Sequence, residues 1–518
     1  MPRYLPLLIA ALLSVTACTR STAVTPLRIQ LWGEPVSLDP ALAEDLLSLH
    51  LLENITESLV GYDGAGQLQD RLAESHEVSA DGKKLTFTLR KDAAWSDGKP
   101  VTAEQVVDGI RRSLSPDLPA KFGMILEPIK GAKAYRSKEV GAEGLGVRAL
   151  DGKVIVELEK PTPYFIHALT LGSAAPIRKE LFEANGGKWK ESFPVNGPYR
   201  ISEHRTDEKY VLERNPFYWK KDSAGLPKIE FLIVREDGTA LNLFEQNQLD
   251  ILTKVSPLDV IRLKKLDAIR LSPFFATYYL GFNVRKPPFD NRDFRRAASA
   301  AIRKEEIVAA LGTDDVPARS FISRGLEGYV PFDPALKDSP LFAHATENVK
   351  KHPPLKGEMV AQFDSNARNS LVLEKVQQDL LKTLGIRIGL LPLDWKSHIK
   401  AMQTEPAAIY RFGWLTPFND PIFFLEPGVT GDRSNYGGFS NARFDQLVEE
   451  IRRAKPGRER EAKIIEAQRI WIEDEAAIVP IYHYTQVHAV SKRVTGYRVN
   501  PFGYLVLPEL GLQKEAIK

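Results

Sequence analysis

The sequence predicts an α/β protein with more than one domain, because two kinds of hydrophobic periodicity alternate along the chain. Segments 27–32, 85–89 and 153–158 alternate apolar and polar residues, which is typical of strands with one solvated face. Segment 370–384 has apolar residues three or four positions apart, which is typical of a helix with one buried face. A chain of 518 residues, 43% of them hydrophobic, has room for about two to four domains with their own cores.

The strands of the N-terminal region are expected to pair antiparallel. Asp-Gly dipeptides at 81–82 and 151–152 come shortly before two of these strands and favour tight turns. Between the strands, Thr102 and Gln105 have the spacing of a capping box, and the apolar residues that follow are spaced for one buried helix face. This region therefore predicts an antiparallel sheet with at least one helix packed on it.

The C-terminal half predicts parallel pairing. Helix 370–384 is followed by Gly385 and at once by an apolar strand at 386–391, which is the helix-to-strand half of a βαβ unit. Three more elements follow: helices at 444–451 and 458–475 and a strand at 476–482. Stretches bounded by or rich in proline are expected near the junctions between lobes, at 161–176, 273–289 and 480–486.

Charge and motifs argue against several classes of protein. The 70 Lys and Arg residues nearly balance the 67 Asp and Glu residues, which leaves a net charge of +3 and predicts no nucleic-acid partner. The zinc-protease, nucleophile-elbow and P-loop motifs do not occur. His483 and His488 lie five positions apart, so a strand would point them to opposite faces rather than toward one metal. We expect no catalytic residues, no metal and no cofactor.

The single cysteine, Cys18, follows a segment that is typical of a secretory signal. Residues 1–17 contain Arg3, then an apolar run that is too short to span a membrane, then small residues up to the thiol. The sequence Val15-Thr-Ala-Cys18 resembles the lipobox of bacterial lipoproteins, in which the cysteine is acylated and the signal peptide is removed just before it. We expect residues 18–26 to be a lipidated tether and the mature protein to be extracytoplasmic, attached to a membrane through Cys18 alone.

Three segments combine large aromatic rings with single charges or amides: 276–283, 393–396 and 410–421. Each aromatic residue taken alone is more often part of a core than of a site. Together, however, they suit a concave site for a sizeable ligand, because rings supply contact area at a low entropic cost while a few polar groups fix orientation.

A long segment at 72–104, LAESHEVSADGKKLTFTLRKDAAWSDGKPVTAE, strongly resembles the signature of family 5 extracellular solute-binding proteins, the receptors of peptide ABC importers. Further stretches resemble the oligopeptide-binding branch in the same order: 37–40, 196–200, 212–219, 283–294 and 477–482. The resemblance covers about nine-tenths of the chain, counted on the sequence.

This resemblance implies a periplasmic-binding-protein fold with two lobes, a hinge between them, and an extra domain on the first lobe. It implies that a ligand is enclosed between the lobes and passed to permease subunits in the inner membrane, with the protein acting as a monomer and not as an enzyme. The implied boundaries are 27–55, 173–273 and 485–518 for domain I, 56–172 for domain II, and 274–484 for domain III.

The resemblance also implies a set of ligand contacts, because oligopeptide receptors bind an extended peptide through its main chain. Arg411 falls on a basic position that can meet a ligand carboxylate. The other implied contact positions are Glu44, Leu46, Phe122, Tyr278, Tyr279, Trp395, Gly413, Trp414, Leu415, Pro417, Asn419 and Asp420.

One position departs from the family pattern. The family reads Gly-Trp-x-x-Asp-x-Asn, with the Asp neutralising the amino terminus of the peptide, whereas this chain has Pro417 at the Asp position. The sequence leaves open whether Asp420 or Glu44 takes over this role, or whether the ligand is N-blocked, a murein fragment or not a peptide. It also leaves open a sensory receptor on the same scaffold and, as a third reading, a secreted hydrolase that uses carboxylates such as Asp420 and Glu426.

Overall fold

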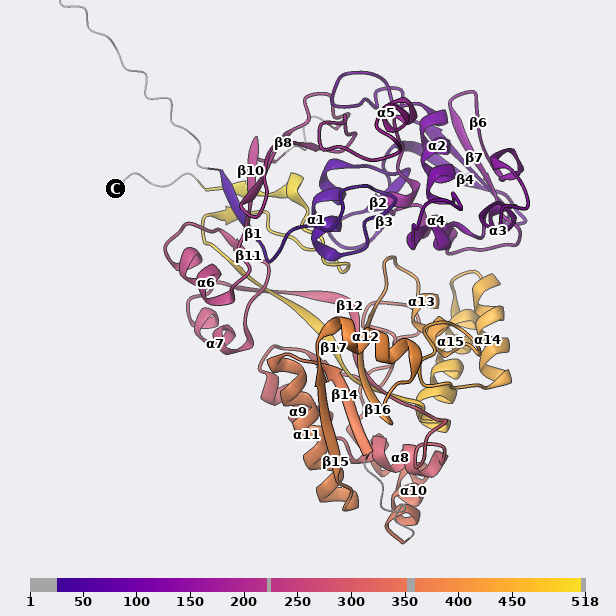
Figure 1. Cartoon of the computed structure of the whole chain (residues 1–518), viewed down its shortest axis with the longest axis vertical. Helices are drawn as coiled ribbons and strands as arrows, with labels where there is room; N and C mark the ends of the chain where they lie inside the picture. The colour runs from indigo at the N-terminus through magenta and orange to yellow at the C-terminus, as the bar shows by residue number, and fades with distance from the viewer. Residues whose placement is uncertain (1–25, 221–224, 352–358, 514–518) are drawn as a thin grey trace, which may run out of the picture.

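The computed structural model describes residues 26–220, 225–351 and 359–513, and the expected signal peptide and Cys18 lie outside these residues. Figure 1 shows two bodies, one above the other, joined by the long strands β12 (Ile269–Phe282) and β17 (Ile478–Val490). We call residues 26–273 and 485–513 the first lobe and residues 274–484 the second lobe. Among the described residues, no helix is long and apolar enough to cross a membrane.

One mixed sheet runs through both lobes, in the order β15-β14-β16-β12-β17-β11-β1-β10-β9-β8, with β13 also paired to β17. Its first-lobe strands are β1 (Leu27–Leu31), β8 (Tyr199–Arg205), β9 (Lys209–Arg214), β10 (Lys228–Ile233) and β11 (Ile251–Leu252). Its second-lobe strands are β13 (Val316–Pro317), β14 (Met359–Asp364), β15 (Ile388–Leu393) and β16 (Ile409–Leu415). Apart from β12 and β17, each strand of this sheet therefore belongs to one lobe.

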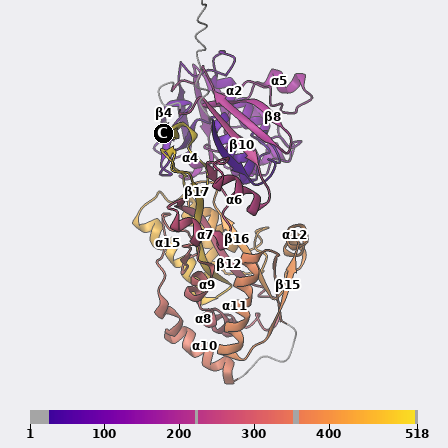
Figure 2. The ribbon, with the colours of Figure 1, turned by 90° about the vertical axis from the view of Figure 1, so that its left-hand side faces the viewer.

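The pairing of β12 with β17 is interrupted where the chain passes from one lobe to the other. Regular antiparallel pairing ends at Pro273 opposite Thr485 and resumes at Thr277 opposite His483. Such an irregularity bends the strands and weakens the ladder locally. Figure 2, turned by 90°, again shows β17 running between the two lobes.

The first lobe carries a second, antiparallel sheet, as the Asp-Gly turns predict. Its order is β4-β5-β7-β6, from β4 (Ala73–Val78), β5 (Lys84–Leu89), β6 (Val147–Leu150) and β7 (Lys153–Glu157). Helix α2 (Ala103–Ser113) packs on this sheet, and the expected capping box is present: Gln105 N donates to Thr102 Oγ1, and Thr102 N donates to Gln105 Oε1. Two short strands, β2 (Val60–Tyr62) and β3 (Leu68–Asp70), form a hairpin beside α1 (Leu46–Ile55), and β18 (Val494–Thr495) pairs with β19 (Gly511–Leu512).

The second lobe contains the βαβ unit that the sequence predicts. Helix α11 (Ala367–Leu384) ends at Gly385, whose φ of 72° suits glycine, and the chain returns as β15 parallel to β14. The predicted strand at 476–482 is the first half of the longer β17. The predicted helix at 458–475 is α-helical only to Arg469 and continues as one wider π-helical turn, Ile470–Asp474.

The remaining helices cover the sheets on both lobes (Figure 1). In the first lobe they are α3 (Ala132–Arg136), α4 (Phe165–Ala168), α5 (Lys179–Ala184), α6 (Asp237–Glu245) and α7 (Pro257–Lys265). In the second lobe they are α8 (Arg292–Ala301), α9 (Lys304–Leu311), α10 (Pro340–Lys351), α12 (Trp395–Thr404), α13 (Ile422–Leu425), α14 (Ala442–Arg453) and α15 (Arg458–Arg469).

Candidate ligand-binding site

Strand β16 presents main-chain groups on its outer side. Its register with β12 is antiparallel, with Gly413 opposite Tyr278 and Leu415 opposite Ala276, and Thr416 N donates to Phe275 O at 3.1 Å. Because bonded and non-bonded pairs alternate in such a ladder, the N–H and C=O groups of Gly413 and Leu415 point away from β12. In the part of the chain that the structure describes, β14 pairs with β16 only as far as Tyr410, so no strand occupies this side.

Arg411 shows the same alternation, and its side chain is already engaged. Its carbonyl points outward and accepts a bond from His398 Nε2 at 3.1 Å. Its guanidinium lies 4.6 Å from the ring centre of Tyr278 and donates to Asp364 at 2.6 Å and to the Tyr484 hydroxyl at 2.7 Å. The side chain thus ties β16 to its neighbours instead of presenting a free cation.

Aromatic side chains lie beside the open edge. Trp395 begins α12 and is 57% exposed, with its ring stacked on Phe412 at a centroid distance of 6.1 Å. Trp414 is half-buried and donates from Nε1 to Phe423 O at 2.8 Å, while Leu415 is 42% exposed. These groups offer apolar surface next to main-chain donors and acceptors, which is the combination expected of a site for an extended ligand.

Tyr278 and Tyr279 lie inside the second lobe. Tyr278 is fully buried and stacks on Tyr482 at 4.7 Å, and its hydroxyl has no hydrogen-bond partner among the described residues. Tyr279 is 2% exposed and packs edge-on against Phe321. Their contacts are those of core residues that support β12.

The loop after β16 brings the second lobe into contact with the first. Asn419 N donates to the Tyr62 hydroxyl at 2.9 Å, and Asn419 Nδ2 donates to Gly66 O at 3.2 Å. Pro417 is buried in the same loop, and the ring of Phe418 stacks on Tyr164. The loop therefore lies against the β2–β3 hairpin and α4.

Asp420 ends this loop in a buried ion pair. Both of its carboxylate oxygens lie 2.8 Å from Arg460 Nη2, and one also accepts from Ile422 N at 2.8 Å. Burial raises the pKa of Asp420, and the adjacent Arg460 opposes that rise. With these partners, Asp420 holds α13 and α15 together.

The first lobe contributes the remaining expected positions. Glu44 forms an ion pair with Lys121, whose own side chain is largely exposed. Leu46 is the first residue of α1 and is half-buried. Phe122, in the short 3-10 helix Phe122–Leu126, packs against the apolar cluster that also contains Phe418. Leu46 packs against the same cluster, which contains residues of both lobes.

A cavity of about 90 Å³, which no motif in the sequence marks, lies beside α1 and the β2–β3 hairpin. It is lined by first-lobe residues, among them Glu53, Glu57, Arg71 and Tyr504, and by Pro417 from the second lobe. Burial raises the pKa of Glu53 to about 7, Arg71 opposes this effect, and Glu57 adds to it. The only signal in the sequence is the spacing of Glu53 and Glu57, four residues apart at the end of a helix, which brings like charges together.

Comparison with known proteins agrees with this architecture. The model for bacterial extracellular solute-binding proteins, family 5, matches residues 67–436. The dipeptide-binding protein DppE of Bacillus subtilis is 28% identical over an alignment of 494 residues that covers 92% of this chain and 90% of DppE. The probable deoxycholate-binding periplasmic protein YgiS of Escherichia coli is 27% identical and covers 92% of each chain.

Solved structures show the same fold. The unliganded open form of MppA, a periplasmic murein tripeptide binding protein, superposes with a TM-score of 0.80 at 26% identity, over 95% of this chain and 98% of MppA. The fold and the matched segment define an extracytoplasmic binding protein and not an enzyme. The chain belongs to family 5 of the bacterial extracellular solute-binding proteins.

Proposed function

We propose that this protein is the substrate-binding lipoprotein of an ABC importer, that it binds an extended oligopeptide or peptide-like ligand between its two lobes, and that it delivers the ligand to permease subunits in the inner membrane. The observation that carries the proposal is the open outer edge of β16. Main-chain bonds at such an edge are available to any peptide, so they give affinity with little sequence specificity.

The positions proposed to contact the ligand are those around this edge. Gly413 and Leu415 supply main-chain groups, while Trp395 and Trp414 supply apolar surface. Glu44, Leu46 and Phe122 face them from the first lobe. Four other predicted positions have side chains that are already bonded or buried, so their proposed role is to support the contact residues from behind. They are Arg411, Tyr278, Tyr279 and Asp420.

The interrupted pairing between β12 and β17 supports a hinge at this point, and the domain limits proposed for it are 273/274 and 484/485. Small changes in backbone angles at a few residues suffice for hinge closure. A monomer anchored through an acylated Cys18 fits this role, because the lobes remain free to close in water. In a Cys18→Ser variant, metabolic labelling with palmitate and partition into detergent should both be lost. Labelling that persists would contradict the anchor.

The main-chain proposal is tested with Leu415→Pro. Proline removes the outward N–H and is tolerated at a sheet edge, so the variant should fold while losing one hydrogen bond to the ligand, a loss of about 3- to 10-fold in peptide affinity. Leu415→Ala keeps the N–H and is the matched control for the lost side chain. Calorimetry with trialanine measures both variants. Equal affinity in the two variants, or no binding of trialanine and longer peptides to the unaltered protein, would count against the proposal.

A further inference from the structure

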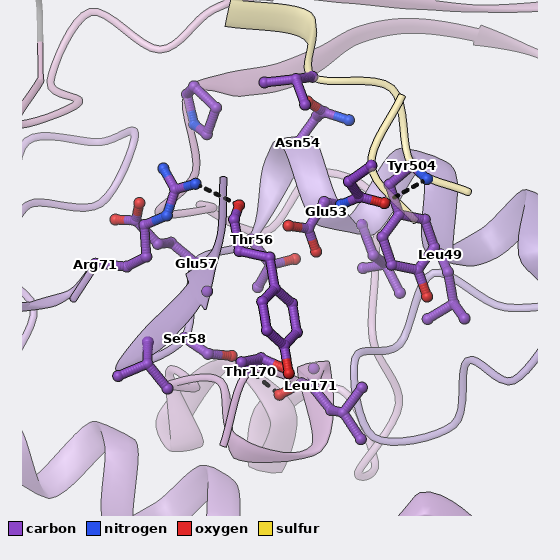
Figure 3. A pocket seen from close by; sticks show the side chains of 18 of the residues that line it. Leu49, Glu53, Asn54, Thr56, Glu57, Ser58, Arg71, Thr170, Leu171 and Tyr504 are labelled. Atoms are coloured by element: carbon purple, nitrogen blue, oxygen red, sulfur yellow. Dashed lines mark hydrogen bonds between the residues drawn. The ribbon is translucent and has the colours of Figure 1, made fainter. Parts of the chain in front are cut away.

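The cavity beside α1 contains one carboxylate, Glu53, that has no hydrogen-bond partner among the described residues. Figure 3 shows Glu53 in the middle of this cavity, between Arg71 and Tyr504. The Glu53 side chain is partly buried and makes no hydrogen bond or ion pair with any described residue. The volume of about 90 Å³ is several times the roughly 10–15 Å³ that one water molecule needs.

The other charged groups around the cavity are engaged. Glu57 accepts bonds from the Tyr218 hydroxyl and from Trp219 Nε1, each at 2.7 Å. Arg71 donates from Nη2 to Tyr62 O at 2.7 Å. The cavity therefore has two carboxylates, Glu53 and Glu57, and one guanidinium, Arg71. Burying an ionised carboxylate is unfavourable unless a cation pairs with it.

The position of the cavity connects it to the proposed ligand edge. Gly413 and Leu415 direct their main-chain groups outward, and Pro417, two residues further along, lines the cavity. We expect a chain that is laid along this edge of β16 and continues toward Pro417 to reach the cavity that Glu53 lines. The two other acidic candidates for holding that end have partners of their own: Asp420 bonds Arg460, and Glu44 bonds Lys121.

We propose that Glu53 is the residue that binds the ammonium group of the ligand, so that the charge missing at Pro417 is supplied from helix α1 of the opposite lobe. This inference rests on the proposed function. It identifies the ligand class as one with a free primary amine at the end that enters the cavity. It also couples binding to closure, because the carboxylate comes from the first lobe and the strand edge comes from the second.

The pairing makes binding depend on pH in a defined direction. Only the ionised carboxylate attracts an ammonium group, and Glu53 has a pKa of about 7 because burial disfavours its charge. The groups that face it are the guanidinium of Arg71, the carboxylate of Glu57, and the hydroxyls of Tyr62 and Tyr504. Burial raises the pKa of Glu57 and moves the pKa values of the two tyrosines further above the neutral range. Affinity for an amine ligand should therefore rise as pH increases from 5.5 to about 7.5.

The test is a double-mutant cycle between Glu53 and the amine. Trialanine and N-acetyl-trialanine are titrated by calorimetry into the unaltered protein and into Glu53→Gln. Removing a buried charged partner should weaken trialanine binding at least 10-fold, whereas acetylated peptide should bind both proteins within about 2-fold. The pH dependence between 5.5 and 7.5 should vanish in the variant.

Glu466→Gln is the matched control, because it removes a carboxylate that already pairs with Arg443 and that is not among the positions proposed to contact the ligand, so it should leave the preference for the free amine unchanged. If Glu53→Gln binds trialanine as tightly as the unaltered protein does, the inference is overturned while peptide binding stands. If neither peptide binds the unaltered protein, the proposed function falls and this inference falls with it.

Discussion

Glu53 is expected to destabilise the unliganded protein at alkaline pH, and Glu53→Gln should relieve that cost. Its pKa is raised from 4.5 to about 7 in the folded protein. At about 1.36 kcal/mol per unit, this shift corresponds to an upper value of about 3 kcal/mol. Because the folded state holds the proton more tightly than the unfolded state, the cost is absent below pH 4.5, grows between pH 4.5 and 7, and is complete above pH 7.

The assay is urea unfolding of both proteins at pH 5 and pH 8. We expect Glu53→Gln to be more stable than the unaltered protein at pH 8, by up to about 3 kcal/mol, with most of this difference gone at pH 5. Glu44→Gln, which alters a partly exposed ion pair, should change stability by less than about 1 kcal/mol at either pH. A variant that is less stable at pH 8, or a difference that does not change with pH, would refute the reasoning.

Two further changes separate buried support from ligand contact. Asp420→Asn removes one of the two carboxylates that pair with the buried guanidinium of Arg460, the other being Glu327, and should cost about 1.5–3 kcal/mol in urea unfolding. The exposed pair lost in Glu466→Gln should cost less than about 1 kcal/mol, and equal losses would contradict the distinction. Trp395→Ala removes a ring that is 57% exposed and should leave the melting temperature nearly unchanged while weakening trialanine binding several-fold in calorimetry. A large fall in melting temperature with unchanged affinity would contradict the role of Trp395.

Local signals in the sequence predicted local structure well. The spacing of Thr102 and Gln105 predicted the start of α2, and Gly385 predicted both the end of α11 and the immediate return to β15. Each of these features depends on residues within one or two helical turns of each other, so the local sequence is enough to predict it.

The site was less predictable because its important contacts join distant segments. Arg411 looked available for a ligand carboxylate, but Asp364, 47 residues earlier, reaches it across two neighbouring strands. Asp420 looked available for an amine, but Arg460, 40 residues later, pairs with it. Glu53 was missed because its spacing from Glu57 does not reveal the cavity, whose lining joins α1 to Pro417 and Tyr504 far along the chain.

The central claim is that a peptide binds along the outer edge of β16, and hydrogen exchange at individual amides tests it most directly. Exchange at Gly413 and Leu415 should slow at least about 10-fold when trialanine is added, because a ligand carbonyl then accepts from an outward N–H. Trp414, whose N–H already points to β12, should change much less. Unchanged exchange at Gly413 and Leu415 in a protein saturated with peptide would contradict the account.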